Sequence, residues 1–153
     1  MKTAQEIIHE KGKNLHSISV DASIQEAIKQ MVANRIGAIL VEDEGQIVGI
    51  WTERDLLRNS ILSDFDPQSS RIGDYMTKDL VTVDASENIY RIMDKILGLR
   101  FRHLPVEKEG QIIGLLSAGD VLKAALVEKI REFDRLNEMV SWEYYENWRW
   151  KKP

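Results

Sequence analysis

Residues 41–57 read VEDEGQIVGIWTERDLL, and residues 106–122 read VEKEGQIIGLLSAGDVL. Extending the alignment at the same offset of 65 pairs residues 24–57 with residues 89–122, and 11 of these 34 positions are identical. Unrelated sequences of this length share roughly two identities at average residue frequencies. The chain therefore contains an internal duplication, and the rest of the sequence is best analysed copy by copy.

Each copy predicts the same order of elements. A short alternating strand leads into a helix whose apolar residues recur at three- and four-residue steps. Two apolar strands follow, joined by an acidic turn that contains Gly45 or Gly110, and a second helix begins after Thr52 or Ser117. One β-α-β-β-α copy has too little apolar surface for a stable core. We therefore expect an α+β fold in which the two repeats pack sheet against sheet.

The duplication divides the chain into two repeats, a linker and a tail. We place the first repeat at residues 5–62, the linker at 63–70, the second repeat at 71–127 and the tail at 128–153. The tail predicts a long helix with one apolar stripe, formed by Leu122, Leu126, Ile130, Phe133, Leu136, Val140, Tyr144 and Trp148. Such a stripe packs either on the chain's own core or on a second subunit, and we favour a homodimer.

Composition excludes several classes of protein. The net charge of −4 disfavours general binding to nucleic acid or to anionic membranes, and the absence of cysteine excludes thiolate metal sites. His9 and His16 do not have the spacing of a metal site, and no nucleophile is paired with a base, so we expect neither a metal nor an enzyme. The sequence shows no signal peptide and no membrane-spanning run, which predicts a cytoplasmic protein.

A hydroxyl and a carboxylate stand three residues apart at the start of the second helix in both copies. These pairs are Thr52 with Asp55 and Ser117 with Asp120. One interpretation is a capping box that only stabilises the helix. The other is a ligand site, because the helix N-terminus attracts a phosphate and an aspartate can accept hydrogen bonds from a ribose diol. The occurrence of the pair at equivalent points of a duplicated unit favours the ligand site.

Several motifs resemble those of the cystathionine-β-synthase (CBS) domain pairs, also called Bateman modules. They are GIWTERD at 49–55, GLLSAGD at 114–120, YMTKD at 75–79 and RHLPV at 102–106, together with the Lys11-Gly12 pair. The resemblance covers about residues 5–127 and is closest to small stand-alone prokaryotic members. It implies a regulatory module that binds AMP, ADP or ATP and requires no cofactor. An effector protein would detect the conformational change that the nucleotide causes.

The resemblance also implies which residues line the two sites. The aspartate of one repeat would work with the strand opening of the other. Ile36 and Gly37 would thus line the site of Asp120, whereas Phe101 and Arg102 would line the site of Asp55. We expect His103 to contact a phosphate, and backbone groups near His16 and Asp79 to contact the base.

The two sites are expected to differ. Gly37 leaves room for a flat ring, whereas Arg102 fills the equivalent position and the bulk of Trp51 would crowd the Asp55 site. We therefore expect the Asp120 site to be the occupied one. The alternative function is a dimerisation or protein-interaction scaffold, whose clefts are empty or bind an S-adenosyl compound.

Overall fold

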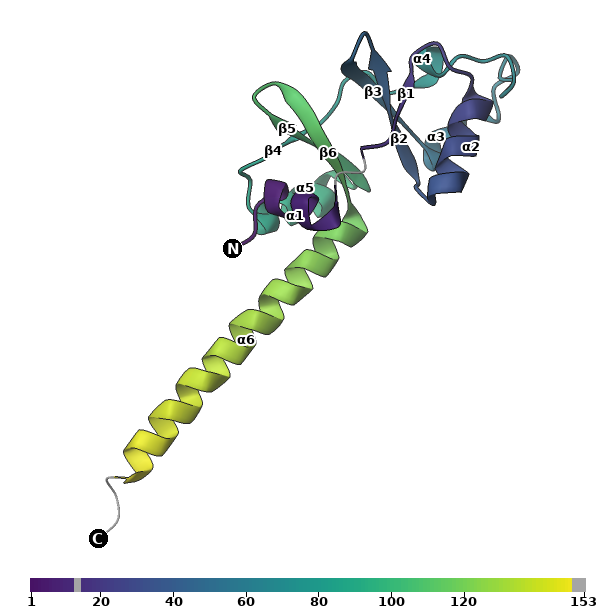
Figure 1. Ribbon diagram of the computed structural model, residues 1–153. Coiled ribbons are helices and arrows are strands. Elements are labelled where there is room, and N and C mark those ends of the chain that lie inside the picture. The colour runs from purple at the N-terminus through teal and green to yellow at the C-terminus, as the bar shows by residue number, and fades with distance from the viewer. Residues whose placement is uncertain (13–14, 150–153) are drawn as a thin grey trace.

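The computed structural model describes residues 1–12 and 15–149, and the side chains up to residue 140. It contains two three-stranded sheets, one in each repeat (Figure 1). Their strands, in sheet order, are β1 (Ser17–Ser19), β2 (Ala38–Asp43) and β3 (Gln46–Thr52), and β4 (Val83–Asp84), β5 (His103–Lys108) and β6 (Gln111–Ser117). In both sheets the first pair of strands is parallel and the second antiparallel. The predicted α+β class and the duplicated unit are confirmed.

Six helices accompany the sheets within the described residues. They are α1 (Ala4–Lys11), α2 (Ile24–Asn34), α3 (Glu53–Asn59), α4 (Ile72–Tyr75), α5 (Ile89–Leu99) and α6 (Ala118–Arg149). Helix α2 begins where Ser23 Oγ accepts the Glu26 N–H at 3.2 Å and the Glu26 carboxylate accepts the Ser23 N–H at 2.8 Å. This reciprocal arrangement is a capping box.

Each sheet has its own apolar core. The core of the second repeat includes α1, which precedes the first sheet, and the core of the first repeat includes α4, which precedes the second sheet. Helix α1 packs on the second sheet, where Ala4, Ile7 and Ile8 are buried. Helix α4 packs on the first sheet, where Ile72 is fully buried. The boundary drawn at residue 5 assigned α1 to the first repeat, but its buried face contacts the second.

Two glycines allow these crossing segments to lie directly on the sheets. A Cβ atom at Gly49 would overlap the Met76 side chain, and a Cβ atom at Gly114 would overlap the Ile8 side chain. Gly49 and Gly114 are equivalent positions of the duplication. The two crossing segments are therefore related by the same pseudo-symmetry as the repeats, with Met76 in the place of Ile8.

The linker follows α3 and turns back over the start of α2. The carbonyl oxygens of Pro67 and Ser70 accept the N–H groups of Gln25 and Ile24 at 2.8 and 3.0 Å. These bonds satisfy two of the N–H groups that a helix leaves without internal partners at its start. The linker is thus part of the folded first repeat.

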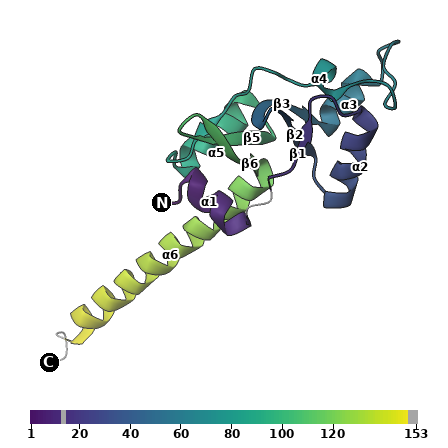
Figure 2. The same cartoon turned by 45° about the horizontal axis from the view of Figure 1, so that its top comes forward.

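Helix α6 leaves the second repeat and projects away from both sheets (Figures 1 and 2). Val121, Ala124 and Ala125 are buried at its start. The stripe from Leu122 to Val140 does not pack on the chain's own core, because its six apolar side chains are each between 51% and 64% exposed. Tyr144 and Trp148 lie outside the residues whose side chains are described. Across residues 1–12 and 15–149, no helix is both long and apolar enough to cross a membrane.

Candidate functional site

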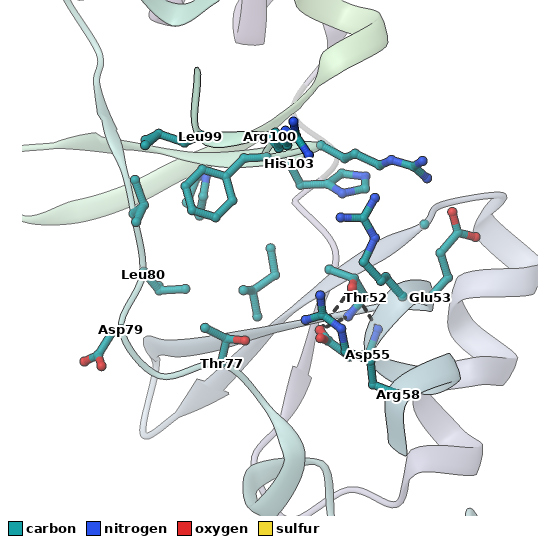
Figure 3. A pocket seen from close by; sticks show the side chains of 17 residues that line it. Thr52, Glu53, Asp55, Arg58, Thr77, Asp79, Leu80, Leu99, Arg100 and His103 are labelled. Carbon is teal, nitrogen blue, oxygen red and sulfur yellow. Dashed lines mark hydrogen bonds between the residues drawn. The ribbon is translucent and has the colours of Figure 1, made fainter. Parts of the chain in front are cut away.

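A cavity of about 440 Å³ lies between the two repeats, at the end of β3 where α3 begins. One wall comes from the first repeat, with Thr52, Asp55 and Arg58. The facing wall comes from the second repeat, with Arg100 and His103 (Figure 3). Residues 77–81 contribute Thr77, Asp79, Leu80 and Val81 along the side. The cavity thus combines residues that are far apart in the sequence, and its volume is in the range of small-molecule sites.

Thr52 and Asp55 form a capping box at the start of α3. Asp55 Oδ2 accepts hydrogen bonds from the Thr52 N–H at 2.9 Å and from Thr52 Oγ1 at 3.0 Å. The Asp55 N–H donates back to Thr52 Oγ1 at 3.2 Å. Among the described residues, Asp55 Oδ1 makes no such bond. The capping interpretation is therefore correct, and it leaves one carboxylate oxygen available to a ligand.

Positive charge gathers around this cavity. Arg54, Arg58, Arg100 and Arg102 all line it, and so do three carboxylates, those of Glu53, Asp55 and Asp79. Arginine binds phosphate through several directed N–H donors. A ligand with an anionic group and a diol would match this mixture of arginines and carboxylates.

The wall of the cavity that comes from the second repeat also supplies the phenyl ring of Phe101 and the imidazole of His103. Phe101 lines the cavity and remains 37% exposed, so its face is accessible to a flat group. Burial lowers the pKa of His103, and Lys11 and Arg102 act in the same direction, while Glu53 and Asp120 oppose them. His103 is therefore mainly neutral near pH 7, and it can still donate one hydrogen bond to a ligand.

The equivalent carboxylate in the second repeat is already engaged. Asp120 Oδ2 accepts the Ser117 N–H and Oγ, as in the first repeat, but Lys11 Nζ also donates to it at 2.7 Å. Burial alone would raise the pKa of Asp120, but the hydrogen bonds from Lys11 and Ser117 outweigh it and hold the pKa below its ordinary value. Asp120 lines a cavity with α1 and the start of α6.

Within the described residues, Ile36 and Gly37 line cavities other than the one that Asp120 forms with α1. Ile36 lines a groove beside Trp51 and Leu56, and Gly37 lines that groove and the Asp55 cavity. A Cβ atom at Gly37 would lie 3.1 Å from Glu53 Oε1. The structure thus places Gly37, Phe101, Arg102 and His103 in the cavity that Asp55 lines.

The family model of the CBS domain matches residues 6–61 and 72–127 of this chain, one match in each repeat. The chain belongs to the CBS-domain family. The resemblance drawn from the motifs is thereby confirmed, with one CBS domain in each copy of the duplication.

Relatives and solved structures agree with this assignment. The mitochondrial CBS domain-containing protein CBSX3 of Arabidopsis thaliana is 33% identical, over 93% of this chain and 73% of its own length. The crystal structure of the CBS domain NE2398 superimposes with a TM-score of 0.77 at 40% identity, covering 82% of this chain and 99% of that one. CBSX2 in complex with AMP gives a TM-score of 0.71 at 28% identity, covering 84% and 99%.

Trp51 does not crowd the Asp55 site of this CBS pair, contrary to the expectation from its size. Its side chain is fully buried in the core of the first repeat. The indole N–H donates to Asn59 Oδ1 at 3.0 Å. Successive side chains of a strand face opposite sides, so Thr52 can line the cavity only if Trp51 points away from it. The part of the argument against the Asp55 site that rested on Trp51 is therefore wrong.

Other residues of the CBS pair occupy places that the sequence did not indicate. The His16 carbonyl oxygen accepts the Leu40 N–H at 3.2 Å, so it is part of the first sheet. Arg54, Arg58 and Arg100 line the cavity although the sequence analysis named none of them as a site residue. The signal for Arg54 and Arg58 was their spacing from Thr52, which places both within the first two turns of α3. Within the described residues, no group of three or more His, Cys, Asp or Glu side chains could hold a metal ion.

Proposed function

We propose that this CBS pair is a regulatory module that binds an adenine nucleotide, AMP, ADP or ATP, in the cavity beside Asp55. The observation that carries the proposal is the meeting of Thr52 and Asp55 with Phe101, Arg102 and His103 in one cavity. The family resemblance connects each of these residues with a ligand. The complex of CBSX2 with AMP supports the same class of ligand.

The groups around the cavity suit the parts of a nucleotide. Asp55 Oδ1 can accept hydrogen bonds from the ribose hydroxyls, since Oδ2 already serves the helix cap. Phe101 offers an apolar face to the base, and the arginines offer donors to phosphate. The four arginines favour a phosphorylated adenylate over an S-adenosyl compound, because the sulfonium group of the latter carries positive charge.

Regulation follows from the position of the cavity between the repeats. A ligand changes a conformational equilibrium only when it binds one arrangement more tightly than another. A nucleotide that contacts α3 of the first repeat and residues 100–103 of the second would favour one separation of the two. We propose that an effector protein detects that change, without catalysis by this chain.

Titration calorimetry with AMP, ADP, ATP and S-adenosylmethionine tests this function, with GMP as the control for the base. We expect heat of binding with at least one adenylate and its loss in Asp55→Ala. The absence of heat with every adenylate at millimolar concentration would refute the proposal. Binding that is unchanged in Asp55→Ala would refute the site.

A second proposal concerns assembly, and it rests on the exposed stripe of α6. We infer that the stripe from Leu122 to Val140 contacts a second copy of the chain, forming a homodimer. Six apolar side chains on one helix face, each more than half exposed, are costly to leave in water. Light scattering on a chain that ends at Val127 tests this contact. A dimer that persists in the shortened chain would show that the stripe is not the interface.

A further inference from the structure

We call the surroundings of Asp55 the first half-site and those of Asp120 the second half-site. They differ most in the groups that contact the aspartate carboxylate at the start of the helix. Lys11, the last residue of α1, places Nζ 2.7 Å from Asp120 Oδ2 and 3.1 Å from the carbonyl oxygen of Leu115. Asp120 Oδ2 therefore accepts three hydrogen bonds, since the Ser117 N–H and Oγ also donate to it. Within the described residues, Asp55 Oδ2 accepts two hydrogen bonds, both from Thr52. In this part of the chain the second carboxylate thus has a partner that the first lacks.

The pseudo-symmetry of the fold identifies the counterpart of Lys11. The Ile24 N–H donates to the Ser70 carbonyl at 3.0 Å, and its equivalent, the Ile89 N–H, donates to the Lys2 carbonyl at 2.9 Å. Ser70 and Lys2 are 68 positions apart, and so are Met76 and Ile8, which lie over equivalent glycines. The same offset of 68 pairs Lys11 with Asp79.

The exchange of lysine for aspartate reverses the charge at one point of the two half-sites. Asp79 lines the cavity of Asp55 and cannot neutralise that carboxylate. Lys11 donates to Asp120 Oδ2 and so places a positive charge beside the carboxylate that would accept hydrogen bonds from a ribose diol. The aspartate of the second half-site therefore has a cationic partner at the point where the first half-site has Asp79.

We propose that Lys11 closes the second half-site, so that each chain binds one nucleotide, beside Asp55. This inference rests on the proposed function, and it adds the stoichiometry and the residue that sets it. A nucleotide at Asp120 must share the carboxylate with Lys11 or displace the two hydrogen bonds that Lys11 makes to Asp120 and to the Leu115 carbonyl. Lys11 is therefore the residue that makes the duplicated sites unequal.

Removal of Lys11 should leave the fold intact. The Lys11 and Asp120 side chains are 42% and 25% exposed, and ion pairs with this exposure contribute little to stability. Helix α1 is anchored by Ala4, Ile7 and Ile8, which are buried in the second core. The variant Lys11→Met also keeps the apolar part of the side chain.

Calorimetry with AMP on the full chain tests the inference through the number of sites. We expect one site per chain in the wild type and two in Lys11→Met, with the second lost again in Lys11→Met/Asp120→Ala. Lys123→Met is the matched control, because Lys123 lines the same cavity as Asp120 and forms no ion pair among the described residues. This control should retain one site.

The outcomes separate this inference from the function on which it rests. One site in both the wild type and Lys11→Met would refute the closure by Lys11 and leave the nucleotide-binding function standing. Two sites in the wild type would also refute it, because Lys11 would then be compatible with a bound ligand. No binding of AMP or of any other adenylate to the wild type and the variant would overturn the function and the inference together.

Discussion

The indole N–H of Trp51 donates to Asn59 Oδ1 at 3.0 Å, which joins the end of β3 to the end of α3. The ring is fully buried among the core residues of the first repeat. Trp51 thus fixes α3, the helix that carries Asp55, to the core of the first repeat, and it does not line the cavity. Trp51 is a structural residue and not a ligand contact.

Replacing Trp51 should therefore lower stability without changing the contacts of a ligand. We expect Trp51→Ala to reduce the free energy of unfolding by about 3–5 kcal/mol, as for other large buried side chains, with a smaller loss in Trp51→Phe. Urea denaturation followed by circular dichroism measures this change. A stability equal to that of the wild type would contradict the buried position.

The two capping aspartates should respond differently to the same substitution. Asp55→Asn keeps an oxygen for the helix cap but weakens acceptance from a ribose diol, so we expect AMP to bind about tenfold more weakly. Asp120→Asn should leave AMP affinity within about twofold of the wild type, because its partner is Lys11. Calorimetry on the two variants checks the contrast. Equal losses would mean that both half-sites bind the nucleotide.

The arginines should act through the phosphate. Hydrogen bonds to charged groups contribute about 1.5–3 kcal/mol, so Arg58→Ala or Arg102→Ala should weaken AMP binding about ten- to hundredfold. Adenosine, which has no phosphate, should bind these variants as it binds the wild type. Arg91→Ala is the control, because Arg91 lies in α5 and does not line the cavity. A matching loss for adenosine would contradict the assigned role.

Affinity should depend on pH through His103. Burial lowers the pKa of the free imidazole, and a phosphate beside it would raise the pKa in the complex by favouring the charged form. Binding then takes up a proton, so AMP should bind more tightly as the pH falls from about 8 to about 6.5. Calorimetry at several pH values measures the slope, and His103→Gln should abolish it. The same slope in this variant would assign the effect to another group.

Assembly should depend on single side chains of the α6 stripe. Leu126 and Phe133 are 61% and 64% exposed, so glutamate at either position costs the monomer little. We expect Leu126→Glu or Phe133→Glu to convert the dimer into a monomer in sedimentation velocity. Arg131→Glu changes the charge of the same helix outside the stripe and should leave the dimer unchanged. Monomer formation by all three variants would point to a general effect of charge.

The duplication was sufficient to predict the repeats, the turns at Gly45 and Gly110 and the capping boxes. These features depend on neighbours within a few residues, which a sequence displays directly. The hydrogen bond of Lys11 to Asp120, on which we base the proposed difference between the two half-sites, joins residues that are 109 positions apart. No local pattern contains that contact, so it played no part in the ranking of the Asp120 site, which rested on Gly37, Arg102 and Trp51.

The position of Trp51 shows a different kind of error. Strand alternation predicts that Trp51 and Thr52 face opposite sides, so the core position of the indole was available from the sequence. The packing of helices α1 and α4 was harder to predict from the sequence. Both helices are short, and each packs in the core of the other repeat. Helix α1 precedes the first sheet and packs in the second core, whereas α4 precedes the second sheet and packs in the first core.

The crossing of α1 onto the second sheet has a consequence for how the chain folds during synthesis. The first core is complete once residues up to about Met76 have left the ribosome, because Ile72 is its last fully buried member. Helix α1 is made before either sheet, but the strands that cover Ala4 and Ile8 include β6, which ends at Ser117. Domains generally fold as units in the order of their synthesis. Helix α1 therefore lacks its partners until the second repeat has been made, and the core of that repeat closes only when both α1 and β6 are present.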